Sequence, residues 1–337
     1  MILKASIEKL MRKQDLDAET CQLVMDEILK PDANSLQISA FLVLLRAKGE
    51  TPEELAGMIA ALKQRMIPVH TPHKVLDIVG TGGDGANTVN ISTASAILAA
   101  ACGIKVAKHG SRAASSLAGS ADVLEALGVN IHLSPEKVSA CIDAVGIGFC
   151  FAPNFHPAMQ TLHALRKQLN VPISFNLLGP LLNPTNPAHL LLGVYNESFM
   201  PLIAHTLQQS GTERSFVVHG CGLDEISCVG TAKILEVTQN AITESMINPE
   251  KYGFSFCQVK DLQGGDAKTN AEILLNTFSG SDQYPHIRDT LILNTATALY
   301  ICGLYPSIEA AIPQAKEKLA DKSALKLLND WREFSHE

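Results

Sequence analysis

The sequence has no apolar run long enough to cross a bilayer and no excess of basic residues. Its longest apolar stretches, such as Ile97 to Ala101, are short and rich in alanine, whereas a membrane-spanning helix needs roughly 20 apolar residues. Lysine and arginine number 27 against 34 aspartate and glutamate residues, which gives a formal net charge of −7. An acidic chain is poorly suited to general attraction by phosphate backbones. We therefore expect no membrane segment and no nucleic-acid partner.

Signatures of zinc binding and of secretion are missing as well. The eight cysteines form no C-x-x-C pair, and the closest intervals, Cys141 to Cys150 and Cys221 to Cys228, fit no zinc template. The first residues lack a basic start followed by an apolar block, so we expect no secretory signal. No repeat of 20 to 50 residues and no low-complexity tract occurs. These absences favour a globular protein of the cytoplasm, with its cysteines as free thiols.

The pattern of apolar residues divides the 337 residues into two unequal parts. Residues 1–66 show helical spacing only, and Thr51-Pro-Glu-Glu54 is a capping box with proline at the first helical position. The stretch 66–72 contains two prolines and no periodicity, which indicates a hinge. We predict a small N-terminal helical domain over residues 1–66, joined by a segment near 160–185, and a larger domain over 71–337.

Short β-branched runs alternate with helical stretches in the larger part, which is typical of an α/β domain with a mostly parallel central sheet. One such helical stretch runs from Thr93 to Cys102 and ends at Gly103. The fold class we predict is thus α/β, with the small helical domain joined to it. The expected strands are 75–79, 104–107, 148–151, 190–195, 215–218 and 233–237.

A cluster of glycines follows the first of these strands. Gly80-Thr-Gly-Gly-Asp-Gly85 fits the G-x-G-x-x-G pattern of dinucleotide-binding proteins. A dinucleotide site, however, needs an acidic residue at the end of the next strand, and that strand runs into Lys108-His-Gly-Ser-Arg112. Positive charge there suits a bare phosphate better than a ribose diol. The turn therefore favours a phosphate or pyrophosphate ligand over a nicotinamide cofactor.

Small polar residues precede the next helix, within a dozen residues of the glycines. Asn90, Ser92 and Thr93 bring an amide and two hydroxyls to a helix N-terminus, which carries roughly half a positive charge and binds anions. There are two simpler alternatives: Ser92 or Thr93 is only an N-cap, and the glycines form only a tight turn. Because the glycines and these polar residues occur together at the end of a strand, we favour phosphate binding.

Two adjacent carboxylates, Asp224 and Glu225, follow a later strand beside two glycines. Adjacent acids on a loop are usually solvated surface, but this pair stands among apolar residues at the edge of the sheet where α/β ligands bind. Carboxylates would repel a phosphate unless a cation came between them. Mg²⁺, which is held by one or two carboxylates together with substrate phosphates, resolves that conflict.

Several motifs, in order along the chain, make the sequence similar to the anthranilate phosphoribosyltransferase family. The resemblance runs from the N-terminal helices to Asn294, and this number of ordered motifs is far more specific than the glycine turn alone. The matching motifs are Gly80-Thr-Gly-Gly-Asp84, Lys108-His-Gly-x-Arg112, Gly119-Ser-Ala-Asp-Val-Leu-Glu-Ala-Leu-Gly128, Phe175-Asn-x-Leu-Gly-Pro-Leu-x-Asn-Pro184 and Gly222-Leu-Asp-Glu225.

The resemblance implies transfer of the 5-phosphoribosyl group from phosphoribosyl pyrophosphate to the amine of anthranilate, in tryptophan biosynthesis. It implies two Mg²⁺ ions per subunit held by Ser92, Asp224 and Glu225, and a homodimer formed through the helical domain. Anthranilate would contact Gly80, His109, Gly110, Ser111 and Arg166, the last through its carboxylate. Phosphoribosyl pyrophosphate would contact Gly80, Thr81, Gly82, Gly83, Asp84, Thr88, Asn90, Ser92, Thr93, Lys108 and Ser120.

The sequence departs from the family pattern at Ser111, where asparagine is usual. Serine is shorter and offers one hydroxyl in place of an amide, so the departure bears on acceptor affinity and identity and not on the phosphate side. An aniline-type amine is unprotonated at neutral pH, and no catalytic base is assigned: His109 could accept the proton or simply form a wall. The alternatives are a related phosphoribosyltransferase with another aromatic acceptor, a pyrimidine nucleoside phosphorylase, a dehydrogenase and a non-catalytic nucleic-acid binder.

Overall fold

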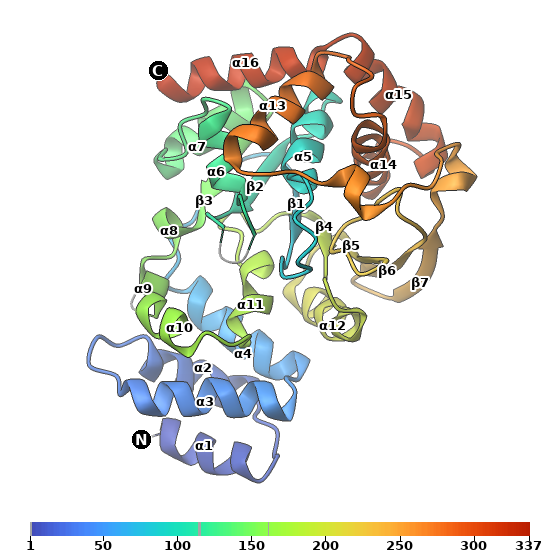
Figure 1. Ribbon diagram of the computed structural model, residues 1–337. Coiled ribbons are helices and arrows are strands. Elements are labelled where there is room, and N and C mark those ends of the chain that lie inside the picture. Colours follow the sequence, from blue (N-terminus) through green and yellow to red (C-terminus); the bar gives the residue numbers. More distant parts are fainter. Residues whose placement is uncertain (1, 114–115, 161) are drawn as a thin grey trace.

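The computed structural model describes residues 2–113, 116–160 and 162–337 and shows a small helical domain beside a larger α/β domain (Figure 1). The helices of the small domain are α1 (Ile2–Met11), α2 (Ala18–Ile28), α3 (Ser35–Lys48) and α4 (Pro52–Lys63). The capping box at the start of α4 is confirmed: Thr51 Oγ1 accepts a hydrogen bond from Glu54 N, and Glu54 Oε2 accepts one from Thr51 N. The prediction of helices alone in this part is correct.

The described part of the larger domain contains one seven-stranded sheet with the order β3-β2-β1-β4-β5-β6-β7. The first five strands in the chain pair in parallel, and β6 and β7 add to β5 in antiparallel fashion. The strands are β1 (Leu76–Gly80), β2 (Val106–Gly110), β3 (Ile147–Phe151), β4 (His189–Gly193), β5 (Arg214–Gly220), β6 (Ala232–Thr238) and β7 (Ile242–Ile247). All six expected strands are present; the sequence did not predict β7, whose middle residues are polar and exposed.

The parallel strands are apolar on both faces because helices cover each face. In β4, Leu191 packs into the apolar cluster that contains α5, whereas its neighbours Leu190 and Leu192 pack into the cluster that contains α12 and the helical domain. This alternation follows from the two-residue period of a strand. The sheet thus lies between two helical layers, and the small domain packs on the same side as α12.

The remaining helices surround this sheet (Figure 1). No helix in the described ranges is long and apolar enough to span a membrane. The helices are α5 (Ile91–Ala101), α6 (Ser120–Ala126), α7 (Pro135–Ala144), α8 (Ala152–Phe155), α9 (Pro157–Gln160), α10 (His163–Leu169), α11 (Phe175–Leu178), α12 (Met200–Ser210), α13 (Ala267–Phe278), α14 (Pro285–Ile301), α15 (Ile308–Ala320) and α16 (Ser323–His336), with 3₁₀ helices η1 (Gly179–Leu181), η2 (Glu197–Phe199), η3 (Pro249–Tyr252) and η4 (Val259–Leu262).

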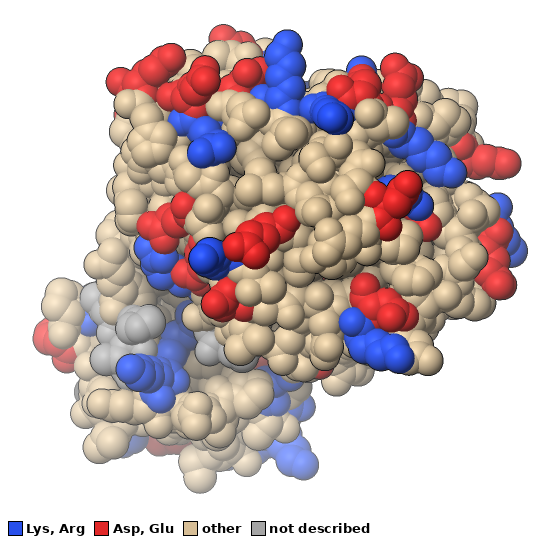
Figure 2. Space-filling model, turned by 45° about the horizontal axis from the view of Figure 1, so that its top comes forward, with Lys and Arg blue, Asp and Glu red and all other residues tan. Residues whose placement is uncertain are grey.

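The segment that contains α10 and α11 returns to the helical domain although it is far from it in sequence. Leu162, Ile173 and Phe175 share one apolar cluster with buried residues of α2, α3 and α4. Figure 1 places α10 and α11 between those helices and the sheet. On the face drawn in Figure 2, acidic and basic side chains are interspersed.

Candidate active site

The glycine turn lies where the strand order of the sheet reverses. β1 pairs with β2 on one side and with β4 on the other, and Gly80 and Gly193, the last residues of β1 and β4, stand opposite each other. Thr81 N continues the contact by donating to Gly193 O over 3.0 Å. In parallel sheets the crevice beyond the carboxyl ends of the strands at such a point is where ligands bind. The fold therefore sets the turn at the expected position for a ligand.

The turn itself depends on glycine for its backbone conformation. Gly82, Gly83 and Gly85 have φ angles of 65°, 91° and 69°, in the left-handed region that favours residues without a Cβ. The hydroxyl of Thr81 accepts a hydrogen bond from Tyr195 N, which ties the turn to the segment after β4. Thr88, further along, forms a single bridge with Gln263. These contacts fix the turn, and its glycines bring no side chains of their own over its backbone.

Asp224 packs directly against this turn. Its Oδ2 accepts a hydrogen bond of 2.7 Å from Gly82 N, and the residue is only 8% exposed. A Cβ on Gly80 would stand 2.1 Å from that oxygen, and one on Gly193 would stand 1.5 Å from the Asp224 carbonyl oxygen. Gly80 is thus required by the close approach of the Asp224 carboxylate, and Gly193 by that of the Asp224 backbone carbonyl. The solvated-surface interpretation of Asp224 is wrong.

Three carboxylates gather at the turn, and their charges oppose one another. Burial raises the pKa of Asp224 to about 6, and the negative charge of Asp84 contributes to that rise. Burial also raises the pKa of Glu225 well above its ordinary value, with Asp224 adding to the effect. Like charges held this close favour a cation between them.

Lys108 is a buried positive charge next to the turn, and its side chain is not on the protein surface. The side chain is 1% exposed, and its Nζ donates to Ile78 O over 2.8 Å and to Ser92 Oγ over 3.4 Å. Burial lowers the pKa of Lys108, while the charges of Asp77 and Glu225 raise it. The predicted lysine therefore stands between the turn, the start of α5 and the acidic pair.

The N-cap residue of α5 is neither Ser92 nor Thr93. Asn90 is the N-cap residue and makes no side-chain cap, so Ser92 and Thr93 lie in the first turn and the N-cap interpretation of either is wrong. The Asn90 amide instead donates to Ala118 O, and its Oδ1 accepts from Asn270 Nδ2 over 2.8 Å. The Asn90 side chain thus does not cap the orphan N–H groups of the helix, among which that of Ser92 contacts the Glu225 carboxyl.

Two buried histidines lie side by side next to the lysine. The rings of His109 and His156 are 5.2 Å apart between centroids, and Nε2 of each is buried without a hydrogen-bond partner among the described residues. Burial lowers the pKa of His109 to about 3, and His156 and Lys108 contribute to that fall. A neutral imidazole of such low basicity is a poor proton acceptor at neutral pH. This favours the interpretation of His109 as a wall of the site over that of a proton acceptor.

Asp77 and Asn183 hold this wall in place. Asp77 Oδ1 accepts from His109 N, and its Oδ2 accepts from Asn183 Nδ2, which also donates to Ala107 O. Sequence reasoning assigned no role to Asp77, Asn183, His156 or Asn270. Asn183 belongs to a motif that pointed to the family, whereas the other three have no local sequence signal.

The residues expected to bind the acceptor are spread over three segments: the end of β1, the end of β2 and α10. Arg166 lies on α10, with its guanidinium 5.6 Å from the centre of the Phe175 ring. It makes no ion pair with a described residue, and burial lowers its pKa. Ser111 is exposed after β2, and a Cβ on Gly110 would meet Ser120 Cβ at 3.0 Å. The structure brings Gly110 and Ser120 together, and shows no contact between Arg166 and Ser111.

The donor set of the turn fits magnesium better than a transition metal. No group of three or more His, Cys, Asp or Glu side chains in the described ranges is arranged to enclose a metal ion. Mg²⁺ does not need such a cage, because it keeps several waters and takes one or two carboxylates together with substrate phosphates. Asp224 and Glu225, with Ser92 next to Glu225 and Lys108, are oxygen donors of that kind.

Comparison with known proteins gives one consistent result over the whole chain. Residues 72–325 match the glycosyl transferase family, a/b domain, and residues 4–66 match the glycosyl transferase family, helical bundle domain. The anthranilate phosphoribosyltransferase of Chlamydia felis is 45% identical over 337 residues, which cover 100% of this chain and 97% of the relative. That of Methanosarcina acetivorans is 44% identical over 99% of this chain and 90% of the relative.

Solved structures agree with this result. The anthranilate phosphoribosyltransferase of Thermus thermophilus superposes with a TM-score of 0.93 and 36% identity, over 98% of this chain and 99% of that one. The enzyme of Saccharomyces cerevisiae in complex with phosphoribosyl pyrophosphate and magnesium gives a TM-score of 0.91 at 28% identity, over 99% and 98%. A complex of the same yeast enzyme with 4-fluoroanthranilate gives 0.89.

Proposed function

The chain belongs to the anthranilate phosphoribosyltransferase family, and on that premise we propose how its own residues perform the reaction of that family. The enzyme transfers the 5-phosphoribosyl group from phosphoribosyl pyrophosphate to the amine of anthranilate, giving N-(5-phosphoribosyl)anthranilate and pyrophosphate, a step of tryptophan biosynthesis. One observation carries the assignment of the site: the glycine turn meets the buried Asp224, followed by the half-buried Glu225, where the strand order reverses.

Phosphoribosyl pyrophosphate would lie over the turn from Gly80 to Asp84 and the start of α5. Backbone amides of the turn, apart from that of Gly82, which donates to Asp224, and amides of the α5 N-terminus would donate to the phosphates. Lys108 adds a positive charge from below, with two of its donors already used by Ile78 and Ser92. The other contacts we propose are those of Thr88, Asn90, Thr93 and Ser120.

Magnesium is the cation that we place between the phosphates and the acidic pair. The yeast relative carries it together with phosphoribosyl pyrophosphate, and Asp224 and Glu225, with Ser92, are the ligands we propose for two ions per subunit. When bound, the ions neutralise the diphosphate as it departs. Asp84 faces Asp224 closely enough to raise its pKa, so the same cations would also relieve the repulsion among the three carboxylates.

Anthranilate would approach from the side of α10 and His109. We assign its carboxylate to Arg166, a partly buried guanidinium without an acidic partner among the described residues, because a carboxylate and a guanidinium form a two-pronged pair. His109, Gly110 and Gly80 would line the path of the ring. Ser111 would meet the acceptor where asparagine is usual in the family.

The chemistry requires positioning more than acid–base catalysis. The amine nitrogen forms a bond to C1 of the ribose while the bond from C1 to the pyrophosphate oxygen breaks, and the amine then loses a proton to solvent. Positive charge builds at the anomeric carbon, as in glycoside hydrolysis. Holding the amine in line with C1 supplies much of the rate, and amide donors preorganised at the departing diphosphate stabilise the transition state.

We further propose the domain limits, assembly and location of the enzyme. Residues 1–66, together with the segment near 160–185, would form the acceptor side, and residues 71–337 the donor and metal side. Exposed apolar residues on α3, Leu36 and Val43, are 79% and 41% exposed and would be covered in a homodimer. The eight cysteines are free thiols, as suits the cytoplasm.

The double variant Asp224→Asn with Glu225→Gln tests the proposed site. It keeps size and hydrogen bonding but removes the charge that holds magnesium, so we expect kcat to fall at least about 100-fold. The fold should stay intact or gain stability, because buried like charges are removed. Circular dichroism, thermal unfolding and a magnesium titration of activity are the measurements.

Glu136→Gln, an exposed acid on α7, is the matched control and should leave kcat unchanged. Near-normal activity of the folded double variant, with an unaltered magnesium requirement, would remove Asp224 and Glu225 from the metal site.

A further inference from the structure

A second pocket lies between the two domains, at the edge of the sheet opposite to the candidate active site. It has a volume of about 260 Å³ and is lined by Ile59 and Lys63 of α4, by the end of α12 and by the segments that lead into β4 and β5. These segments precede the strands, whereas the glycine turn follows β1. A five-residue strand, roughly 16 Å long, therefore separates the two sites.

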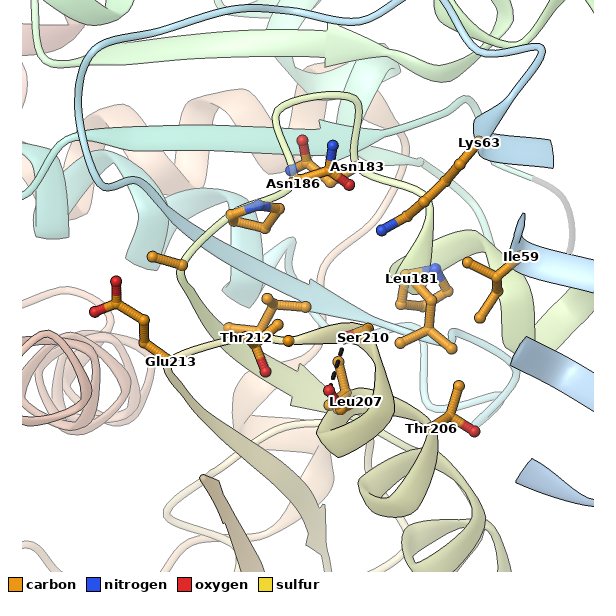
Figure 3. A pocket seen from close by; sticks show the side chains of 15 residues that line it. Ile59, Lys63, Leu181, Asn183, Asn186, Thr206, Leu207, Ser210, Thr212 and Glu213 are labelled. Atoms are coloured by element: carbon orange, nitrogen blue, oxygen red, sulfur yellow. Dashed lines mark hydrogen bonds between the residues drawn. The ribbon is translucent and has the colours of Figure 1, made fainter. Parts of the chain in front are cut away.

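The pocket contains one cation that has no partner in the described ranges. Lys63 makes no hydrogen bond or ion pair with a described residue, and Figure 3 shows its side chain extending from α4 toward the middle of the pocket. Burial lowers its pKa, which reflects the cost of holding an ammonium group away from water without a counter-ion. Glu213, the acid in the lining, is already bound to Lys74 over 2.9 Å.

Both domains contribute apolar residues to the lining of the pocket. Leu181, Leu190 and Leu207 come from the larger domain and face Ile59 of the smaller one. Thr212 adds a hydroxyl that is closed off from solvent and has no hydrogen-bond partner among the described residues. A half-buried cation without a counter-ion, next to these apolar side chains, favours a ligand with one negative charge and an apolar body.

We propose that this pocket is a binding site for a small monocarboxylic acid with an apolar body, and that the bound acid inhibits the enzyme. The carboxylate pairs with Lys63, and the body of the acid fills the space between Ile59 and Leu207. Since the walls come from both domains, the ligand favours the present arrangement of the domains over any other. The binding site stands independently of the proposed function; only the inhibition rests on it.

A chain of contacts leads from the pocket toward the active site. Asn183 belongs to the lining, and its amide donates to Asp77, which in turn accepts from His109 N. Pro184, the next residue, accepts from Val69 N in the hinge segment. A ligand that holds this loop therefore acts on the wall of the acceptor site and on the hinge together.

Methyl NMR with hexanoate as the probe tests the site directly. Hexanoate is a saturated acid of suitable size and does not imitate the planar acceptor. We expect saturable shifts of the Ile59 and Leu207 methyl signals, with a Kd of about 1 mM, a value suited to a fragment with one charged anchor. Hexanamide, the neutral analogue, should bind at least about tenfold more weakly.

Variants separate this pocket from the active site. Lys63→Met should weaken hexanoate binding at least about tenfold, and Lys63→Gln guards against a folding defect of the methionine variant. Two controls should leave hexanoate binding unchanged: Lys9→Met, which changes an exposed lysine on α1, and Arg166→Ala. Unaltered binding in both Lys63 variants, loss of binding in Arg166→Ala, or the absence of saturable shifts would each overturn the proposed site.

Kinetics then test the inhibition. Hexanoate should raise the apparent KM of the wild-type enzyme for both substrates and should have no such effect on Lys63→Met. Hexanoate binding that leaves the kinetics unaltered would overturn the inhibition and not the site. An inactive enzyme that still binds hexanoate through Lys63 would count against the proposed function alone.

Discussion

Asp224 shows how one side chain can dictate the residue types around it. Its carboxylate and carbonyl oxygens lie so close to Gly80 and Gly193 that neither position has room for a Cβ. The glycine-rich turn is therefore shaped as much by the acid that packs against it as by a ligand. Asp224 in return carries an unfavourable buried charge, and burial raises its pKa to about 6.

Arg166 is the residue whose proposed role is easiest to isolate. Arg166→Ala should raise the KM for anthranilate about tenfold to a hundredfold, because a charge-assisted pair with the carboxylate is lost. The KM for phosphoribosyl pyrophosphate should change little. Steady-state kinetics with each substrate varied in turn provide the measurement.

Lys167 is the natural control for this prediction, since it is the exposed neighbour of Arg166. Lys167→Ala should leave both KM values unchanged. Equal rises of the two KM values in Arg166→Ala would contradict the assignment to the acceptor site.

At the scale of elements, α13 supports the phosphate side by holding the start of α5. Asn270 of α13 donates to Asn90 Oδ1 and accepts from Gly265 N. Asn270→Ala leaves the Asn90 oxygen unpaired and loosens the N-terminus of α5. We expect the KM for phosphoribosyl pyrophosphate to rise about tenfold, with a smaller change for anthranilate.

Asn276 near the other end of α13 offers a control with the same chemistry, because its amide donates to Gln283 away from α5. Asn276→Ala should not affect either KM. If Asn270→Ala lowers only the melting temperature and leaves the kinetics unaltered, α13 has no part in binding the donor.

For the whole molecule, the buried carboxyl of Asp77 makes stability depend on pH. Burial raises its pKa from 3.8 to about 6, so between these values the folded state keeps a proton that the unfolded state has lost. Its contribution to stability is then fully present below about pH 4 and falls as pH rises through 6, by about 3 kcal/mol at most. Urea unfolding from pH 4 to 7 measures this change.

Asp77→Asn removes the titrating group and should flatten the profile between pH 4 and 6 relative to the wild type. The comparison cancels the contribution of Asp224, whose pKa is raised in the same sense. Parallel profiles for the two proteins would show that Asp77 does not titrate in this range.

The assembly of the molecule gives a further prediction at this scale. Leu36 and Val43 lie seven residues apart on α3, hence on one face of the helix, and both are exposed. Leu36→Glu with Val43→Glu should convert the proposed homodimer into a monomer in light scattering. The control is Leu304→Glu, which changes an exposed apolar residue beyond α14 and should leave the dimer intact. A dimer that persists in the double variant would place the interface elsewhere.

The amino-acid sequence determined the strands, the helices and the chemistry of the turn, because these depend on local patterns. Alternating apolar runs placed six strands, and glycine, hydroxyl and acidic residues indicated a phosphate and a cation. β7 was missed because its exposed polar residues give no strand signal. The N-cap at Asn90 was missed because its side chain serves a contact with Asn270, 180 positions away.

Only the tertiary structure decided which of these residues meet. Asp77, His156, Asn183 and Asn270 entered the site through contacts between distant segments, which no local pattern encodes. The parallel sheet brings the ends of β1, β4 and β5 to one edge, so that residues 142 positions apart share a hydrogen bond. Burial at that edge then raised the pKa values of Asp224 and Glu225. At the opposite edge, the packing of the two domains left Lys63 as a cation without a partner among the described residues.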